Sequence, residues 1–308
     1  MVLAVESLSD RIMEMVSDQP WPGCRVEVGG VGITWMSSAI FSILLTTGVL
    51  LAVFLTAARK HKRPEGPSRW QRPASGSANL IEVLVVFVRD MIARPALHDR
   101  AYEHLPFLMT LFVFVLGMNL LGIVPLDPLA RVAHLPGIGH TATSIPTVCG
   151  ALASLAMLKV VLTGLAAQAS RFRASHRWPA PVCYAVSPLL WLLNLAPPVP
   201  GVVGKILLVP LAFIELIGAA AKGLALMIRL CANMLSGHTL LALMLIFVFR
   251  AVQAWLEAGS PYILVVGPAA IAGSLAFNLL ELLVAGLQAY ILTLLTAMFL
   301  GLYGGQAH

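Results

Sequence analysis

The chain has 308 residues, of which 59% are hydrophobic and 11% are charged, and its mean hydropathy is +0.88. Because a soluble globular domain carries about 25% charged residues, this composition excludes such a domain and indicates an integral membrane protein with several spans. The net charge of +6 does not point to nucleic acid, since the basic residues cluster in short segments beside apolar runs, as orientation signals do.

The membrane-crossing segments are expected to be helices, because the apolar runs are long and do not alternate in polarity. The predicted fold class is therefore an all-α polytopic membrane protein with about five membrane helices, plus an amphipathic helix at the inner surface. A single membrane domain is expected over residues 34–303. The four cysteines have neither CxxC nor metal-ligand spacing, so no disulfide framework, metal site or cofactor is predicted.

The N-terminus of the chain is expected to lie on the outer side of the membrane. Residues 1–33 form an outer N-terminal segment, either a surface helix or a poorly ordered tail, and residues 34–57 are long enough to span. The following segment ARKHKRPEGPSRWQR holds six Lys and Arg residues, which places it on the inner side. The stretch over 58–104 is therefore predicted to be an inner basic linker followed by a surface helix over 78–94, a segment with too many charges to span.

The central part of the chain is predicted to cross the membrane twice. Residues 105–126 run outward and residues 145–168 run back inward to the basic segment RFRASHR. The next stretch, 178–205, is rich in proline and is expected to be a re-entrant or surface loop.

Two apolar stretches at the C-terminal end are too long for a simple span. Residues 206–255 would make about 75 Å of helix, whereas a bilayer core is about 30 Å thick. Residues 262–303 present the same problem. Each stretch is either two spans or one long, steeply tilted helix.

The first long stretch carries charged residues at regular spacing. Glu215, Lys222, Arg229 and Ser236 are seven residues apart, so on a helix they drift by only about 20° per step and share one face. Asn233 lies beside Arg229 on this face. His238 lies on the opposite side of the helix, and Gly237 removes a side chain where another group must approach closely.

Polar residues also lie within the second long stretch, where Glu281 and Gln288 are seven apart and share a face. Each charge alone has a simple structural explanation: Lys222 could extend to a membrane surface, or an acid could pair with it. Five ionisable groups on two apolar helices are not explained by packing. Acidic residues and histidines inside a membrane are typical of proton relays.

Two segments, RLCANMLSGHTLL (229–241) and LLELLVAGLQAYILTLLTAMFL (279–300), resemble subunit a of the rotary F-type ATP synthase. LFVFVLGMNLLGIVP (111–125) and HTATSIPTVCGALASLA (140–156) resemble its second and third spans. The resemblance covers roughly residues 78–303 and is most specific at the C-terminal end. Glu215 and Lys222 fall where many members have an acid and a lysine. Six positions match the family's polar pattern: Arg229, Asn233, Gly237, His238, Glu281 and Gln288.

The resemblance implies that the last two helices form a tilted hairpin against a rotating ring of c subunits, each with one carboxylate. Two aqueous half-channels would reach the ring from opposite sides, with Arg229 between them. His238 and Glu281 would relay protons from the outer side. Glu215, and with it Lys222, would line the exit to the inner side, and Asn233 and Gln288 would position Arg229 without neutralising it.

The implied protein is a stator component and has no catalytic site of its own. Its implied partners are the c-subunit ring, the peripheral-stalk b subunits, other ATP synthase subunits and membrane lipid. Its expected location is the bacterial plasma membrane, or alternatively the mitochondrial inner membrane. Proton or sodium coupling is decided largely by the ion site of the ring, which is another chain.

Two other classes of protein fit the residues less well. A secondary transporter that binds an anionic substrate at Arg229 would have inverted repeats with paired broken helices, and the sequence has no internal repeat. A haem or quinone protein would need a second intramembrane histidine facing His238. The sequence provides none on the last two apolar stretches.

Overall fold

The structure, a computed structural model, describes residues 25–28, 31–34, 37–60, 76–123, 145–176, 187–188, 191, 202–258 and 262–303. The chain forms two compact units. The first comprises Met1–Ala52, Val113–Cys149 and Ile228–Ala289, and the second comprises Val53–Phe112, Gly150–Met227 and Tyr290–His308. Each unit is described by itself.

Long helices dominate the described residues, among which five helices are long and apolar enough to cross a membrane. The all-α polytopic fold class is thus confirmed. The long helices are α2 (Ser38–Lys60), α5 (Ala101–Ile123), α7 (Pro146–His176), α9 (Val202–Ala258) and α10 (Tyr262–Tyr303). They satisfy their backbone hydrogen bonds within each segment, as a bilayer requires.

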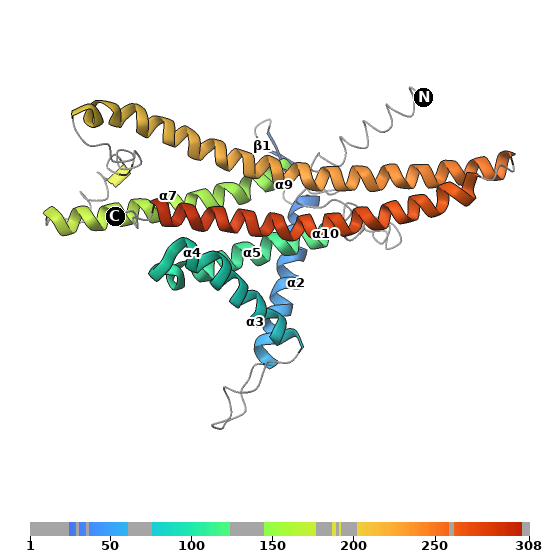
Figure 1. Ribbon diagram of the computed structural model, residues 1–308, viewed down its shortest axis with the longest axis horizontal. Coiled ribbons are helices and arrows are strands. Elements are labelled where there is room, and N and C mark those ends of the chain that lie inside the picture. The colour runs from blue at the N-terminus through green and yellow to red at the C-terminus, as the bar shows by residue number, and fades with distance from the viewer. Residues whose placement is uncertain are drawn as a thin grey trace. The chain divides into compact units, whose positions relative to one another are not determined.

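The two long C-terminal stretches are each one continuous helix, which resolves the alternative left open by their length. Helix α9 has 57 residues and α10 has 42, and Figure 1 shows both as long uninterrupted ribbons. Pro210 lies inside α9 without ending it. Residues 202–205 of the loop predicted over 178–205 are helical, because α9 begins at Val202; most of the rest of that predicted loop lies outside the described residues.

A short β-hairpin precedes α2 and was not predicted. Strands β1 (Arg25–Val28) and β2 (Val31–Thr34) pair antiparallel, with Arg25 opposite Thr34 and Val28 opposite Val31. Alternating β-branched residues favour strands here. The membrane helix consequently starts later than the predicted residue 34. The Ser37 hydroxyl accepts a hydrogen bond from the Ile40 amide at 3.3 Å and caps the helix that begins at Ser38.

The predicted helix over 78–94 is present in the second unit. It comprises α3 (Ser77–Phe87), the π-helical turn η2 (Val88–Ala93) and α4 (Arg94–Leu97), followed by the 3₁₀ turn η3 (His98–Arg100). Three of its charged residues are paired, since both Arg89 and Arg94 contact the Asp90 carboxylate, at 2.8 and 2.9 Å. The end of α10 packs closely here, because a Cβ on Gly301 would meet the carbonyl oxygen of Ala96.

Close packing of small residues also joins helices in the first unit. A Cβ on Gly117 of α5 would lie 3.0 Å from a methyl group of Leu50 on α2. Helices α9 and α10 run side by side in this unit, where Gly273 faces the sulfur of Met244 at 3.5 Å from its Cβ position. Without a hydrophobic driving force between helices in lipid, such close contacts are what hold membrane helices together.

Candidate functional site

The charged stripe on α9 lies on a surface that the rest of the described chain leaves uncovered. Lys222, Arg229 and Ser236 are exposed and Glu215 is half-buried. Another side of the same helix is buried. Its residues are Ala219, Leu226, Leu230 and Met234. The Lys222 ammonium lies 3.9 Å from a Glu215 carboxylate oxygen, so these two residues share a face, as their spacing predicts.

Arg229 forms no ion pair with an acidic side chain in the part of the chain that the structure describes. A guanidinium keeps its charge under all physiological conditions, and placing one at bilayer depth costs at least about 2.5–3.5 kcal/mol. Asn233, one turn further along, is half-buried. An uncovered, permanent cation on a membrane helix therefore requires either water or a partner from another chain.

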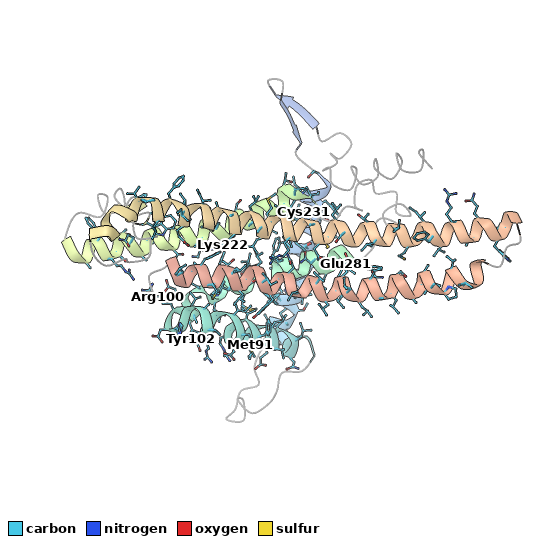
Figure 2. The ribbon with its side chains drawn as sticks, turned by 45° about the horizontal axis from the view of Figure 1, so that its top comes forward. Met91, Arg100, Tyr102, Lys222, Cys231 and Glu281 are labelled. Atoms are coloured by element: carbon cyan, nitrogen blue, oxygen red, sulfur yellow. The ribbon has the colours of Figure 1, made fainter. Side chains whose placement is uncertain are left out.

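Glu281 on α10 lies directly against Gly237 on α9. A Cβ built on Gly237 would meet one carboxylate oxygen of Glu281 and would lie 2.7 Å from its Cδ. The close approach expected at Gly237 is therefore present, and the approaching group is a carboxyl group. Figure 2 labels Glu281 on α10.

The Glu281 carboxyl group is also deeply buried. Glu281 is only 4% exposed, and neither carboxylate oxygen has a hydrogen-bond partner among the described side chains. Burying a charged carboxylate without a partner is costly. An acidic side chain kept at such a position is a candidate for a role beyond packing.

Gln288 follows Glu281 two turns along α10 and is 3% exposed. Their shared burial agrees with the shared face that their spacing predicts. Between them in sequence, the carbonyl of Ala285 accepts a hydrogen bond of 3.5 Å from the buried Asn119 amide on α5. Asn119 is not among the predicted site residues, although an asparagine within the apolar run LGMNLLG is a signal that could have identified it.

His238 lies within the continuous helix α9, next to Gly237. The orientation of its side chain is outside what the structure describes. Its role beside Glu281 remains a prediction from the resemblance to the family.

Lys222 has a second neighbour, which sequence reasoning also missed. Its ammonium lies over the ring of Phe299 on α10, 5.3 Å from the ring centroid, and Figure 2 labels Lys222 on α9. Phe299 is 7% exposed. A phenylalanine in an apolar helix gives no sequence signal of such a role. Nearby, Thr296 donates its hydroxyl to the Leu292 carbonyl at 2.7 Å, a local backbone bond that is common for threonine in membrane helices.

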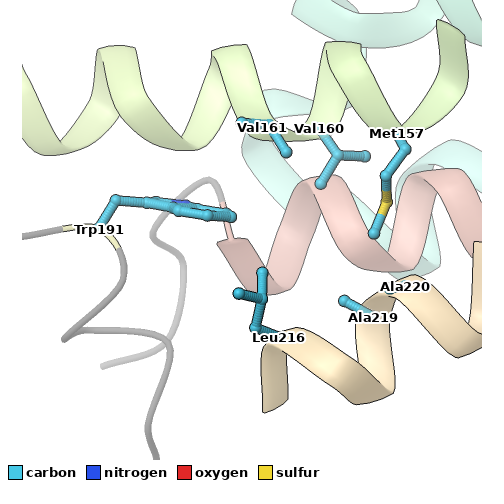
Figure 3. Close-up of a pocket in the computed structure, with 7 residues that line it drawn as sticks. All are labelled: Met157, Val160, Val161, Trp191, Leu216, Ala219 and Ala220. Carbon is cyan, nitrogen blue, oxygen red and sulfur yellow. The ribbon is translucent and has the colours of Figure 1, made fainter. Parts of the chain in front are cut away.

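The second unit also contains a cavity of about 190 Å³ between α7, α9 and Trp191 (Figure 3). Its lining is apolar apart from the indole; the residues are Met157, Val160, Val161, Trp191, Leu216, Ala219 and Ala220. A buried water needs two to four polar partners. Although Leu216 follows Glu215 in sequence, this cavity has no chain of polar groups that could carry a proton.

The fold and the charged stripe define a multi-pass helical membrane protein with ionisable groups on its two longest helices. Residues 40–301 match the family described as ATP synthase A chain. The chain belongs to this family.

The relatives are bacterial and similar over most of their length. ATP synthase subunit a of Chloroherpeton thalassium is 32% identical, over 92% of this chain and 72% of the relative. Subunit a of Hyphomonas neptunium is also 32% identical, over 89% of each chain. Subunit a of Maricaulis maris is 32% identical, over 89% of this chain and 90% of the relative.

Proposed function

We propose that this chain is the stator subunit of the ATP synthase Fo sector, in a bacterial plasma membrane. It provides two aqueous half-channels that carry protons to and from the carboxylates of the c-subunit ring, and so couples proton flow to rotation and ATP synthesis. It has no catalytic site of its own. Its partners are the c ring, the peripheral-stalk b subunits and other subunits of the synthase.

The single observation that carries this proposal is the uncovered charged stripe of α9. Arg229 is exposed and has no acidic partner among the described residues, while the other side of the helix is buried at Leu230 and Met234. A membrane charge in this position needs a counter-ion from outside the chain. Carboxylates that arrive one at a time on a ring supply it.

The chemistry follows from the residue type. In a site of low dielectric constant, a permanent cation favours the ionised form of a nearby carboxylate. A ring carboxylate therefore releases its proton before it passes Arg229 and takes up another afterwards. The same charge repels protons that would leak directly between the half-channels.

The other groups are assigned to one half-channel each. Glu281, buried against Gly237, and His238 relay protons from the outer side, since both carboxyl and imidazole groups can take up and release protons. Glu215, paired with Lys222, lines the inner path. Asn233 and Gln288 provide neutral hydrogen-bonding groups that keep Arg229 in position.

Cysteine cross-linking tests the interface. A cysteine at the exposed Ala232 or Ser236 of α9 should form a disulfide with a cysteine placed beside the c-subunit carboxylate. A cysteine at Met234, which is 1% exposed on the other side of the helix, is the matched control and should not. Equal cross-linking at Met234 and Ala232, or none at Ala232 and Ser236, would argue against this face as the ring interface.

A further inference from the structure

We infer that Phe299 is a positioning residue for proton release: its ring holds the Lys222 ammonium beside Glu215 and keeps it away from the path of the ring carboxylates. This inference rests on the proposed function, because it assigns Glu215 to the inner path. The relationship that suggests it joins three residues of the second unit, two on α9 and one on α10.

The geometry is specific. The Lys222 ammonium lies 5.3 Å from the centroid of the Phe299 ring and 3.9 Å from a Glu215 carboxylate oxygen. Within about 6 Å of a centroid, an ammonium is attracted to the negative face of an aromatic ring. Phe299 itself is 7% exposed, so its ring is fixed by packing and offers a stationary surface. Lys222, by contrast, has a side chain that is 50% exposed.

The Lys222 ammonium has to be held in place because the lysine side chain is long and flexible. Lys222 lies seven residues before Arg229 on the same exposed stripe of α9, about 10 Å along the helix axis. An unheld ammonium with a four-carbon stem can swing along this stripe. It would then offer a ring carboxylate a second cation in competition with Arg229, and it would leave the side of the Glu215 carboxylate.

The contact with Glu215 alone is too weak to prevent this movement. A distance of 3.9 Å is at the outer limit of an ion pair, and partly exposed pairs of this kind contribute little. The aromatic face supplies the second contact. Cation–π contacts change an equilibrium by between about twofold and about thirtyfold, depending on how far water is excluded.

Substitutions at Phe299 distinguish the effect of its aromatic face from the effect of its side-chain volume. Phe299→Leu and Phe299→Met keep an apolar side chain of similar burial and remove the aromatic face, whereas Phe299→Tyr and Phe299→Trp retain it. Phe277→Leu is the matched control: Phe277 is a half-buried aromatic on the same helix, and no described cation lies over its ring.

Proton conductance through Fo is measured in membrane vesicles stripped of the catalytic sector, after normalisation to the amount of subunit in the membrane. We expect Phe299→Leu and Phe299→Met to lower it by between about twofold and about thirtyfold. Phe299→Tyr, Phe299→Trp and Phe277→Leu should leave it near the wild-type value. In a Lys222→Gln background, Phe299→Leu should cause no further loss, because the ammonium that the ring holds is already gone.

A second measurement does not depend on proton flow. The rate at which a small imidoester modifies Lys222 in the purified synthase, followed by mass spectrometry, should rise in Phe299→Met and stay unchanged in Phe299→Tyr. A Phe299→Met rate equal to wild type, or losses of conductance that add fully in the double variant, would overturn the inference. ATP-driven proton pumping by Arg229→Ala, measured in vesicles that keep the complete synthase, separates the two questions: lost pumping leaves the proposed function standing even where the Phe299 variants behave as wild type.

Discussion

The carboxyl group of Glu281 occupies the space that the Cβ of any other residue at Gly237 would fill. In the first unit, the missing side chain of the glycine on α9 thus leaves the space that the acid on α10 fills. The contact brings a buried ionisable group against the backbone of α9, one residue before His238 and two turns after Arg229. Sequence spacing alone indicates that something approaches Gly237, and the structure identifies the group.

Gly237→Ala should displace Glu281 and impair proton transport. Its Cβ would lie 2.7 Å from the Glu281 Cδ, so the carboxyl end of this flexible side chain would have to turn away from its position against α9. We expect ATP-driven proton pumping in inverted membrane vesicles to fall about tenfold, a part of the roughly 10²–10⁴-fold that a positioned proton-transferring group contributes.

Gly273→Ala is the control for this substitution. It lies on the partner helix α10, and its Cβ would make an ordinary contact with the Met244 sulfur at 3.5 Å. Pumping should remain near wild type in this variant. Equal loss in both variants would mean that glycine is needed for general helix packing and not for room beside Glu281.

Glu281→Gln should remove transport while leaving the protein folded. Glutamine has nearly the same shape, so it fits the buried site against Gly237, but it cannot take up and release a proton. Loss of a proton-transferring group typically costs about 10² or more in rate. The measurement is passive proton conductance, together with immunoblotting for the amount of subunit in the membrane. Normal conductance in Glu281→Gln would exclude Glu281 from the relay.

Gly301→Ala should destabilise the protein without acting on the proton path. The new Cβ would collide with the Ala96 carbonyl oxygen, which belongs to the backbone and cannot rotate away as a side chain does. We expect a loss of stability of about 1–3 kcal/mol, seen as a lower thermal midpoint of the purified protein in detergent.

Gly48→Ala on α2 provides the comparison, since no described atom lies within 4 Å of its Cβ position. This substitution should be neutral or stabilising by up to about 1 kcal/mol, because alanine favours helix more than glycine does. A thermal midpoint for Gly301→Ala at or above that of Gly48→Ala would show that α4 moves aside at no cost.

Much of the helical architecture follows from the sequence because apolar length and basic flanks are strong signals in a membrane protein. The shared face of Glu215 and Lys222 also follows, because a spacing of seven determines the side of a helix. The start of α2 does not, because the apolar run continues across the residues of β2, and the helix begins only after the Ser37 cap.

Contacts between distant segments are beyond a single sequence. Phe299 has the same local surroundings as other apolar residues of α10, and only the fold brings its ring to Lys222. Asn119 is visible as a polar residue in an apolar run, but its partner, the Ala285 carbonyl, is 166 residues away. Sequence spacing predicts faces of helices, whereas these roles depend on which faces meet.

We propose that Arg229 acts on ring carboxylates that reach it one at a time. The direct test is proton transport in Arg229→Ala. In inverted membrane vesicles with the complete synthase, we expect ATP-driven proton pumping to be abolished while the assembled complex remains present. Arg229→Lys should also fail to restore coupled pumping, because a buried ammonium can lose its proton whereas a guanidinium cannot. Pumping by Arg229→Ala at the wild-type rate would contradict the account.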